Sequence, residues 1–366
     1  MIKVMIVFGT RPEAIKMCPL VKEMARSETI KPVVCATGQH REMLQQVLEI
    51  FQVKPDYNLT VMKHGQDLYD ITTAVMLGMR DILNQERPKA VLVHGDTTTA
   101  SASAMAAFYQ QIPVGHVEAG LRTFNMFSPF PEEYNRQNIG LIARWHFAPT
   151  ETAKDNLLRE GKRESAIYVT GNTGIDALRT TVRDDFSHPL LDWAAGSRLL
   201  LITAHRRENL GEPMHHMFRA IRRIVEEFPD VKAVYPVHLN PIVRQAADEA
   251  FGSCDRIRLI DPLDAVTFHN VMARSYLIMT DSGGIQEEAP AFGKPVLVMR
   301  DTTERPEGVR EGTLRLVGTD ENTIWAACKE LLTEPEAYKK MSQAANPYGD
   351  GRASERIRKV LEEALG

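Results

Sequence analysis

A glycine turn between an apolar segment and the start of a helix lies at residues 280–289, which read Thr-Asp-Ser-Gly-Gly-Ile-Gln-Glu-Glu-Ala. The apolar run at 275–279 before it has the length of a buried parallel strand. In such a turn, free backbone N–H groups and the positive end of the helix dipole point toward one spot. We therefore expect an anion site, with a phosphate or diphosphate as the ligand. The alternative is an ordinary tight turn. The run Gln286-Glu287-Glu288 weighs against it, because an acidic residue beside a phosphate is useful only if it reaches something else, such as ribose hydroxyls.

Charged side chains follow several other predicted strands. They are Arg11, Asp96, Glu118, the run His205-Arg206-Arg207, and His238. Each also has an ordinary explanation. Asp96 precedes three threonines and could cap a helix, Glu118 could be a partnered structural carboxylate, and residues 205–207 could be a surface basic run. Residues 132–133 favour a helix N-terminus, where a charge is usually solvated. Taken together, charges at five strand ends predict one site at a common rim.

The elements that would position these residues form two successive sets of alternating strands and helices. The first set has predicted strands at 4–8, 32–36, 90–94, 113–117, 146–148 and 167–170, and predicted helices at 12–24, 41–51, 67–85 and 98–110 and from 151. Residues 186–196 break the rhythm. The second set has predicted strands at 198–203, 233–237, 257–260, 276–280 and 295–299, and a helix at 213–228.

This alternation predicts an α/β protein with two Rossmann-like, doubly wound parallel sheets. We place the first domain at residues 1–170 and the second at 171–352. The C-terminal helix at 353–366 is expected to pack back on the first domain. In such folds ligands bind beyond the carboxyl ends of strands, so the cleft between the domains is the expected active site.

The composition of the 366 residues is that of an ordinary globular protein, with 43% hydrophobic and 25% charged residues. A formal net charge of −4 gives no sign of a nucleic-acid or membrane surface. The four cysteines, Cys18, Cys35, Cys254 and Cys328, have no metal-like spacing. The apolar N-terminus at 1–8 is too short for a signal peptide, and no segment approaches the roughly 18 apolar residues of a membrane span. We expect a reduced, cytoplasmic protein.

Several kinds of catalytic site are disfavoured. Eleven histidines include the pair at 215–216, but no HExxH or equivalent metal-binding spacing occurs. The first turn, Gly-Thr-Arg-Pro-Glu at 9–13, lacks the second and third glycines of a dinucleotide fingerprint. No GxSxG nucleophile motif is present. The residues by themselves therefore indicate a two-domain protein that binds a phosphorylated or nucleotide ligand.

Ten motifs, in this order, resemble the non-hydrolysing UDP-N-acetylglucosamine 2-epimerases over nearly the whole chain. They are FGTRPEAIKM from Phe8, VLVHGDTTT from Val91, PVGHVEAGLRT from Pro113, PEEYNRQ from Pro131, TGNTGIDAL from Thr170, AHRRENLG from Ala204, YPVHLNP from Tyr235, TDSGGIQEEAP from Thr280, GKPVLVMRDTTERPEG from Gly293 and NPYGDG from Asn346. The resemblance implies the two-domain architecture of GT-B glycosyltransferases and a cytoplasmic homodimer.

The resemblance also implies an activity and its residues. Family members interconvert UDP-GlcNAc and UDP-ManNAc without a metal or nicotinamide cofactor, through elimination of UDP to 2-acetamidoglucal and re-addition, and supply ManNAc-type sugars for cell-surface polysaccharide. The implied acid and base residues are Asp96, Glu118 and Glu132, with His205 at the diphosphate. The implied substrate-binding residues are Arg11, Lys16, Phe268, Ser282, Gly283, Gly284, Glu288 and Arg305.

Many bacterial members of this family also bind UDP-GlcNAc at a second, activating site. The matching positions are Gln39, Gln66, Arg206 and His238, with Glu132 at the border of both sites. Glu42 stands where Bacillus-type members have glutamine, and Gly65 stands where they have arginine. We expect weaker activation, because an arginine near a diphosphate is lost. The alternative functions are a hydrolysing epimerase that releases UDP and ManNAc, a GT-B glycosyltransferase and a non-enzymatic UDP-sugar sensor.

Overall fold

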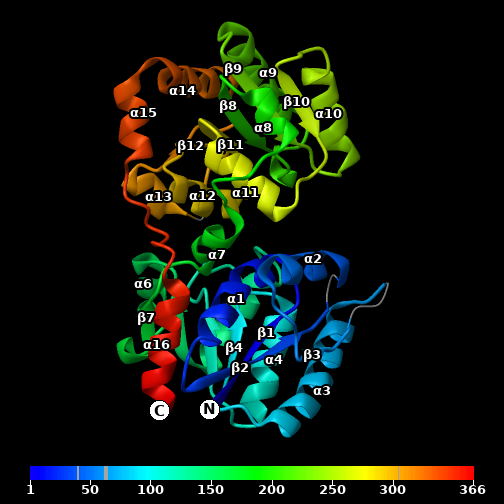
Figure 1. The fold of residues 1–366 in the computed structure, drawn as a ribbon, viewed down its shortest axis with the longest axis vertical. Coiled ribbons are helices and arrows are strands. Elements are labelled where there is room, and N and C mark those ends of the chain that lie inside the picture. The colour runs from blue at the N-terminus through cyan, green and yellow to red at the C-terminus, as the bar shows by residue number, and fades with distance from the viewer. Residues whose placement is uncertain (39–40, 62–64, 304) are drawn as a thin grey trace. The chain divides into compact units, whose positions relative to one another are not determined.

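The computed structural model describes residues 1–38, 41–61, 65–303 and 305–366. The chain forms two compact units, which are described separately. The first contains residues 1–180 and 348–366, and the second contains residues 181–347. The sequence placed the divisions at 170 and 352. Each unit contains one parallel β-sheet with helices on both faces (Figure 1). The predicted pair of doubly wound sheets is confirmed.

The first unit has a seven-stranded parallel sheet in the order β3-β2-β1-β4-β5-β6-β7. Its strands are β1 (Ile2–Phe8), β2 (Ile30–Ala36), β3 (Tyr57–Asn58), β4 (Ala90–His94), β5 (Val114–Val117), β6 (Ala143–Ala148) and β7 (Ile167–Val169). Its helices are α1 (Arg11–Met24), α2 (Arg41–Phe51), α3 (Leu68–Glu86), α4 (Thr98–Tyr109), α5 (Glu132–Ile142), α6 (Glu151–Arg159), α7 (Thr173–Thr181) and α16 (Ala353–Leu365). Strand β3 has two residues and was not predicted, since so short a segment shows no periodicity.

The strands of the first unit are buried on both faces, so their sequences are nearly continuous apolar runs rather than alternating ones. One face packs against α1, α2 and α16, and the other packs against α3 and α4. Helix α16 lies along α1, where Arg358 Nε donates to Glu23 Oε1 at 3.0 Å (Figure 1). The C-terminal helix is therefore part of the first unit, although the whole second unit separates it from α1 in the sequence.

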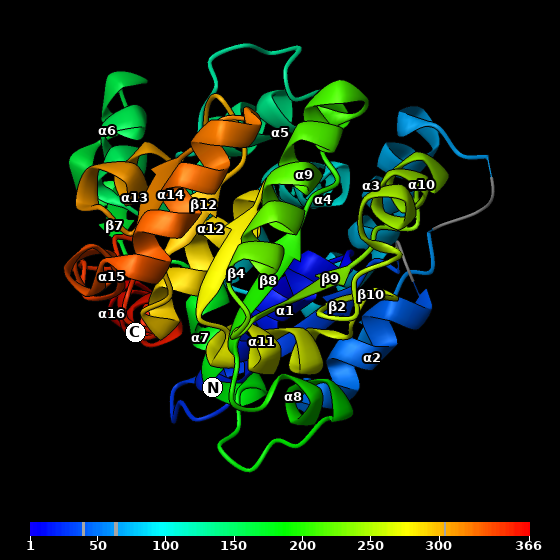
Figure 2. The same ribbon diagram turned by 90° about the horizontal axis from the view of Figure 1, so that it is seen from above.

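The second unit has a six-stranded parallel sheet in the order β10-β9-β8-β11-β12-β13. Its strands are β8 (Arg198–Thr203), β9 (Val231–Pro236), β10 (Ile257–Ile260), β11 (Leu277–Thr280), β12 (Val296–Val298) and β13 (Leu314–Leu316). Its helices are α8 (Pro189–Ala194), α9 (Glu212–Glu227), α10 (Pro241–Phe251), α11 (Ala265–Arg274), α12 (Gly283–Glu288), α13 (Pro306–Glu311), α14 (Glu321–Thr333) and α15 (Pro335–Ser342). In Figure 2 this sheet runs between the pair α9 and α14 and the pair α8 and α11.

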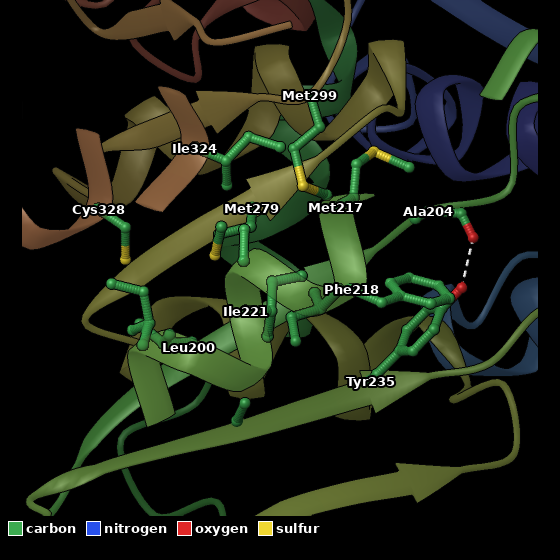
Figure 3. Packing of buried hydrophobic residues seen from close by; sticks show 14 of the residues in the cluster. Leu200, Ala204, Met217, Phe218, Ile221, Tyr235, Met279, Met299, Ile324 and Cys328 are labelled. Atoms are coloured by element: carbon green, nitrogen blue, oxygen red, sulfur yellow. Dashed lines mark hydrogen bonds between the residues drawn. The ribbon is translucent and has the colours of Figure 1, made fainter. Parts of the chain in front are cut away.

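The larger core of the second unit lies between the sheet and helices α9, α10 and α14 (Figure 3). Phe218 of α9 packs at its centre against Tyr235 of β9, with ring centroids 5.6 Å apart. The Tyr235 hydroxyl donates a hydrogen bond to the backbone carbonyl of Ala204. Since Ala204 is the residue before His205, this buried bond fixes the segment that leaves β8.

Six strands have the same order in both sheets, and the first sheet adds β7 at its edge, so the strand order reverses at the same place in each. The reversal lies between β1 and β4 in the first unit and between β8 and β11 in the second. Ligands of such sheets bind at the carboxyl ends of the strands that flank this switch point. The segments 9–11, 95–96, 204–206 and 281–284 follow those four strands.

Candidate functional site

Glu118 follows β5 in the first unit and has a strained backbone. Its φ of +64° is in the left-handed region, which a glutamate rarely adopts. Residues held in that region occur often where the surrounding structure fixes a functional side chain. Its side chain is 12% exposed.

One carboxylate oxygen of Glu118, Oε2, is surrounded by donors. Lys16 Nζ of α1 contacts it closely, Asn172 Nδ2 lies 3.5 Å away, and His94 Nε2 lies 3.6 Å away. Burial raises the pKa of Glu118, but the charges of Lys16 and His94 outweigh burial and hold the pKa well below its usual range. Within the described part of the chain, Oε1 has no hydrogen-bond partner. Glu118 is thus an ionised carboxylate with one oxygen still open.

Asp96 follows β4 and is held by helix α5. Arg136 donates to Asp96 Oδ2 from Nε at 2.9 Å and from Nη2 at 2.6 Å. Asn135 Nδ2 donates to the backbone carbonyl of Asp96 at 2.8 Å. The alternative reading of Asp96 as a helix cap is wrong, because Thr97 is the residue that caps α4.

Glu132 and Glu133 begin α5, as the sequence predicts, but they differ in burial. Glu133 is fully buried and accepts the backbone N–H groups of Thr123 and Phe124. The expectation that charges at this position would be solvated is wrong for Glu133, since its hydrogen bonds replace water. Glu132 is partly exposed. Burial raises the pKa of Glu133. The hydrogen bonds from Gln137 and from the backbone N–H groups of Thr123 and Phe124 outweigh burial and leave the pKa below its ordinary value.

Arg11 and Lys16 lie in the first turns of α1, whose N-terminus is unusually well capped. Thr10 and Glu13 form a reciprocal capping box. Glu13 also accepts a hydrogen bond from the Thr97 hydroxyl at 2.8 Å, which joins the turn after β1 to the turn after β4. The Arg11 side chain is exposed, whereas Lys16 is directed to Glu118.

The glycine turn of the second unit follows β11, as predicted. Ser282 is the N-cap residue of α12 and makes no side-chain cap bond. A Cβ at Gly283 would lie 2.6 Å from Arg305 Cζ, so only glycine allows the guanidinium to lie against the backbone there. Arg305 Nε also donates to Glu287 Oε1 at 2.8 Å. A Cβ at Gly284 would meet open space.

Asp281, between β11 and Ser282, joins this turn to the segment after β8. Its Oδ2 accepts the backbone N–H groups of His205 and Arg206, both at 2.8 Å. Asn209 Nδ2 donates to the same oxygen at 3.2 Å. Asp281 was not among the predicted site residues, although it lies directly after a predicted strand and just before Ser282 and two glycines.

His205 lies between Asp281 and His238. Its Nδ1 is 3.5 Å from Asp281 Oδ1, and its ring stacks on that of His238 at 5.4 Å between centroids. Burial lowers the pKa of His205, and His238 and Arg206 lower it further, while Asp281 acts in the opposite direction. The neutral imidazole is thereby favoured near neutral pH.

Glu288 and Phe268 lie on α12 and α11. Glu288 Oε2 is 3.6 Å from His269 Nε2, and the His269 Nδ1 bonds the Thr181 hydroxyl at 2.8 Å. Phe268 is partly buried against the smaller core of the second unit. The structure therefore brings together, within the second unit, the residues of the sequence prediction that lie after β8 and on α11 and α12.

The positions of the expected activating site are divided between the two units. Gln66 belongs to the first unit, where its Nε2 donates to the Val61 carbonyl at 2.8 Å. Arg206 and His238 belong to the second. Gln39 lies outside the described residues. Gly65 is exposed, with a φ of +79°.

Among residues 1–38, 41–61, 65–303 and 305–366, none of the helices has the length and apolar character of a membrane span. In the same ranges, no group of three or more His, Cys, Asp or Glu side chains is arranged to hold a metal ion.

Two doubly wound parallel sheets, each with charged side chains at its switch point, define a protein of the GT-B-like fold class. The model of the UDP-N-acetylglucosamine 2-epimerase family matches residues 22–362, and the chain belongs to this family. The UDP-N-acetylglucosamine 2-epimerase of Bacillus subtilis (strain 168) is 61% identical over 364 residues, covering 100% of this chain and 95% of that protein.

Solved structures agree with this assignment. A crystal structure of a Listeria monocytogenes protein of the same family has a TM-score of 0.96 and 56% identity, and the match covers 100% of this chain and 96% of that one. The UDP-GlcNAc 2-epimerase of Neisseria meningitidis, solved bound to UDP-GlcNAc, has a TM-score of 0.89 and 47% identity. That match covers 99% of this chain and 100% of the other.

Proposed function

We propose that this protein interconverts UDP-GlcNAc and UDP-ManNAc at C2 of the sugar, by elimination of UDP and its re-addition, without hydrolysis. The family and the Neisseria relative's bound UDP-GlcNAc support the substrate. The observation that supports this chemistry most is the pair of carboxylates at two neighbouring strand ends of the first sheet, Asp96 after β4 and Glu118 after β5. Asp96 is held by Arg136, and Glu118 is held at one oxygen only. Two carriers suit a reaction that removes a proton from one face of C2 and returns one to the other.

The elimination explains how a weak base can act on this substrate. The C2–H bond of the sugar is not acidic by itself. When the C1–O bond to UDP breaks, the electron pair of the C2–H bond forms the C1–C2 double bond, the base keeps the proton, and UDP leaves with the C1–O electron pair. Re-addition reverses these steps with a proton delivered to the opposite face. The product keeps its UDP, and no water is consumed.

In this proposal the first unit supplies the proton carriers. Asp96, Glu118 and Glu132 are the acid and base candidates, and Lys16 holds Glu118 in its ionised form. A carboxyl with a depressed pKa is ionised and therefore ready to accept a proton. It is a weak base, but a weak base suffices once departure of UDP has made the C2 proton acidic.

The second unit would hold the UDP. The Ser282 hydroxyl and the backbone N–H groups at Gly283 and Gly284, together with His205 and with Arg11 of the first unit, would bind the diphosphate, whose charge increases as UDP leaves. The backbone N–H of Ser282 is occupied, since it donates to the Thr280 hydroxyl at 2.9 Å. Glu288 would bind the ribose hydroxyls, and Phe268 and Arg305 would place the nucleotide. The fixed position of His205 on Asp281 supports its place in this set.

Incubation of UDP-GlcNAc alone in deuterated water tests the proposal. We expect deuterium at C2 of both UDP-sugars, because solvent exchanges with the carboxyl that delivers the proton, and we expect UDP to remain attached. A hydrolysing epimerase would accumulate free UDP and ManNAc. A glycosyltransferase would leave the C2 hydrogen in place. UDP-ManNAc without deuterium at C2 would exclude the elimination route even if conversion occurred.

We also propose a homodimer. Helices α3, α4 and α5 pack side by side and expose large apolar side chains: Leu77, Phe108, Tyr109 and Leu141, each at least half exposed. Exposed apolar surface on adjacent helices is typical of a subunit interface. Sedimentation of the wild type and of Phe108→Glu tests this assignment. A wild type that sediments as a monomer at micromolar concentration would refute it.

A further inference from the structure

His94 is a buried side chain at the end of β4 that none of the assigned roles includes. It is 4% exposed. Its Nε2 lies 3.6 Å from Glu118 Oε2 and has no hydrogen-bond partner within the described residues. A buried ring nitrogen without a hydrogen-bond partner destabilises the folded protein. Its position beside the carboxylate of Glu118 therefore needs a compensating interaction.

The charges around His94 supply that reason. Glu13 of α1 accepts three hydrogen bonds, from the N–H groups of Gly9 at 3.1 Å and Thr10 at 2.8 Å and from the Thr97 hydroxyl at 2.8 Å. Both of its oxygens act as acceptors, as expected of an ionised carboxylate. Burial raises the pKa of Glu13 above its ordinary value, and these hydrogen bonds and the charge of His94 offset only part of that rise. The ionised form is assigned from the three donors that its oxygens accept.

Glu13 and Glu118 together place two negative charges in the buried region around His94. Lys16 supplies one positive charge. His116 of the neighbouring strand β5 cannot supply a second. It donates from Nε2 to the Gly95 carbonyl at 2.8 Å, and burial lowers its pKa to about 3. A net charge left in a buried region costs more than a balanced set of charges.

We propose that His94 carries the second positive charge and acts as a positioning residue for Glu118. With Lys16 it holds Oε2, so that Oε1 is the oxygen that exchanges a proton with the substrate. The inference rests on the proposed function, since it concerns the state of Glu118 in that reaction. The proton of His94 stays on Nε2 throughout, and its charge stabilises the carboxylate form of Glu118.

The consequence is a shift in the pH dependence with a definite sign. Removal of a positive charge beside Glu118 raises the pKa of Glu118. An opposite charge at this separation shifts a carboxyl by about 1 to 3 pH units. In the direction in which Glu118 removes the C2 proton, the acid limb of kcat/KM moves to higher pH. In the reverse direction Glu118 is the acid, and the alkaline limb moves to higher pH as well.

The test compares His94→Gln with the matched control His146→Gln. Gln keeps an amide near the position of Nε2 but carries no charge. His146 is also buried on the same sheet, and its Nδ1 is also unpaired within the described residues. For His94→Gln we expect the limbs of kcat/KM to move upward by at least about one pH unit. We expect KM for UDP-GlcNAc within about twofold of wild type, because His94 is not in the proposed UDP-binding set. For His146→Gln we expect no shift of either limb.

A second measurement reads the charge of His94 in the wild-type protein, and a variant serves only to assign its signals. The measurement is the 15N chemical shift of the ring nitrogens in wild-type protein labelled with 15N-histidine. The signals of His94 are those absent from His94→Gln or His94→Phe. We expect their shifts to be those of an imidazolium at pH 7. A neutral His94 ring, or limbs of His94→Gln that coincide with wild type, would overturn the inference. Absence of C2 deuterium incorporation by the wild type would instead refute the proposed function, so the two failures are distinguishable.

Discussion

The backbone N–H of His205 donates a 2.8 Å hydrogen bond to the carboxylate of Asp281. The two residues are 76 positions apart in the chain and follow β8 and β11, the two strands that flank the switch point of the second sheet. Because Asp281 also accepts from Arg206 and Asn209, one buried carboxylate fixes the conformation of the segment that carries His205. Ser282, the first residue of the proposed diphosphate turn, comes directly after it.

Asp281→Asn should therefore weaken UDP binding although Asp281 is not proposed to touch UDP. An amide cannot accept every bond that the carboxylate accepts, and a buried donor left unpaired costs about 1–3 kcal/mol. We expect a roughly tenfold or larger loss of UDP affinity by calorimetry, with a lower Tm of the second unit. Asp261→Asn is the control, since it makes the same charge change on a side chain that is 83% exposed. Equal UDP affinity in wild type and Asp281→Asn would contradict this role.

Asp96→Asn and Glu118→Gln should each lose most turnover and keep the affinity for UDP. Neither amide can carry a proton, and a general acid or base contributes roughly 100- to 10,000-fold. Steady-state rates and calorimetry with UDP separate the two effects. Asp81→Asn, at a side chain 70% exposed on α3, controls for loss of a charge in the first unit. A variant that turns over within a few-fold of wild type would remove its residue from the catalytic set.

Arg11→Ala and Ser282→Ala should act mainly through UDP. Loss of a charge-assisted hydrogen bond to phosphate costs about 1.5–3 kcal/mol, which is roughly a 10- to 150-fold rise in Kd. Arg11 is exposed, so its loss should leave the Tm unchanged. Arg26→Ala, two residues beyond the C-terminal end of α1 on a side chain 75% exposed, is the matched control. Unchanged UDP affinity in Arg11→Ala would exclude it from the diphosphate site.

Acid should destabilise the first unit through its buried histidines. Burial lowers the pKa of His116 to about 3 and that of His146 to about 4, whereas both take up protons near pH 6.5 when unfolded. Their contribution is complete above pH 6.5 and is lost as the pH falls toward their folded pKa values. At pH 5 each should cost about 2 kcal/mol relative to pH 7.

Trp145 can report this effect. Of the three tryptophans it alone belongs to the first unit, so Trp193→Phe with Trp325→Phe leaves it as the only fluorophore of its kind. In that background, denaturant unfolding at pH 7 and pH 5 gives the loss of unfolding free energy. His146→Gln should reduce this loss by about 2 kcal/mol. An identical pH dependence in the variant would show that His146 is not held neutral.

Activation by UDP-GlcNAc is a separate prediction. If Gln39, Gln66, Arg206 and His238 bind a second UDP-GlcNAc, the reaction from pure UDP-ManNAc should begin with a lag that added UDP-GlcNAc removes. Gly65→Arg should strengthen the activation, because it restores a cation that can pair with a diphosphate. Progress curves from UDP-ManNAc freed of UDP-GlcNAc provide the measurement. A linear start in both proteins would contradict the second site.

The sequence by itself determined the fold class and the strand ends that carry charge. Buried parallel strands are continuous apolar runs, and a strand that ends in a charged or glycine residue is visible without a structure. For this reason residues 4–8, 90–94 and 198–203 were predicted within two residues of the observed strands. The short strands β3 and β13 were missed. Strand β13 is as short as β7 and β12, which were predicted, but Arg315 interrupts its apolar run.

Only the tertiary structure decided which side chains contact the predicted site residues. Arg136 on Asp96, His94 beside Glu118 and Asp281 under His205 are contacts between segments about 24 to 76 residues apart. Their partners depend on strand order and register, which a single sequence does not state. The left-handed backbone of Glu118 and the burial of Glu133 were equally invisible, because both result from packing that overrides local preference.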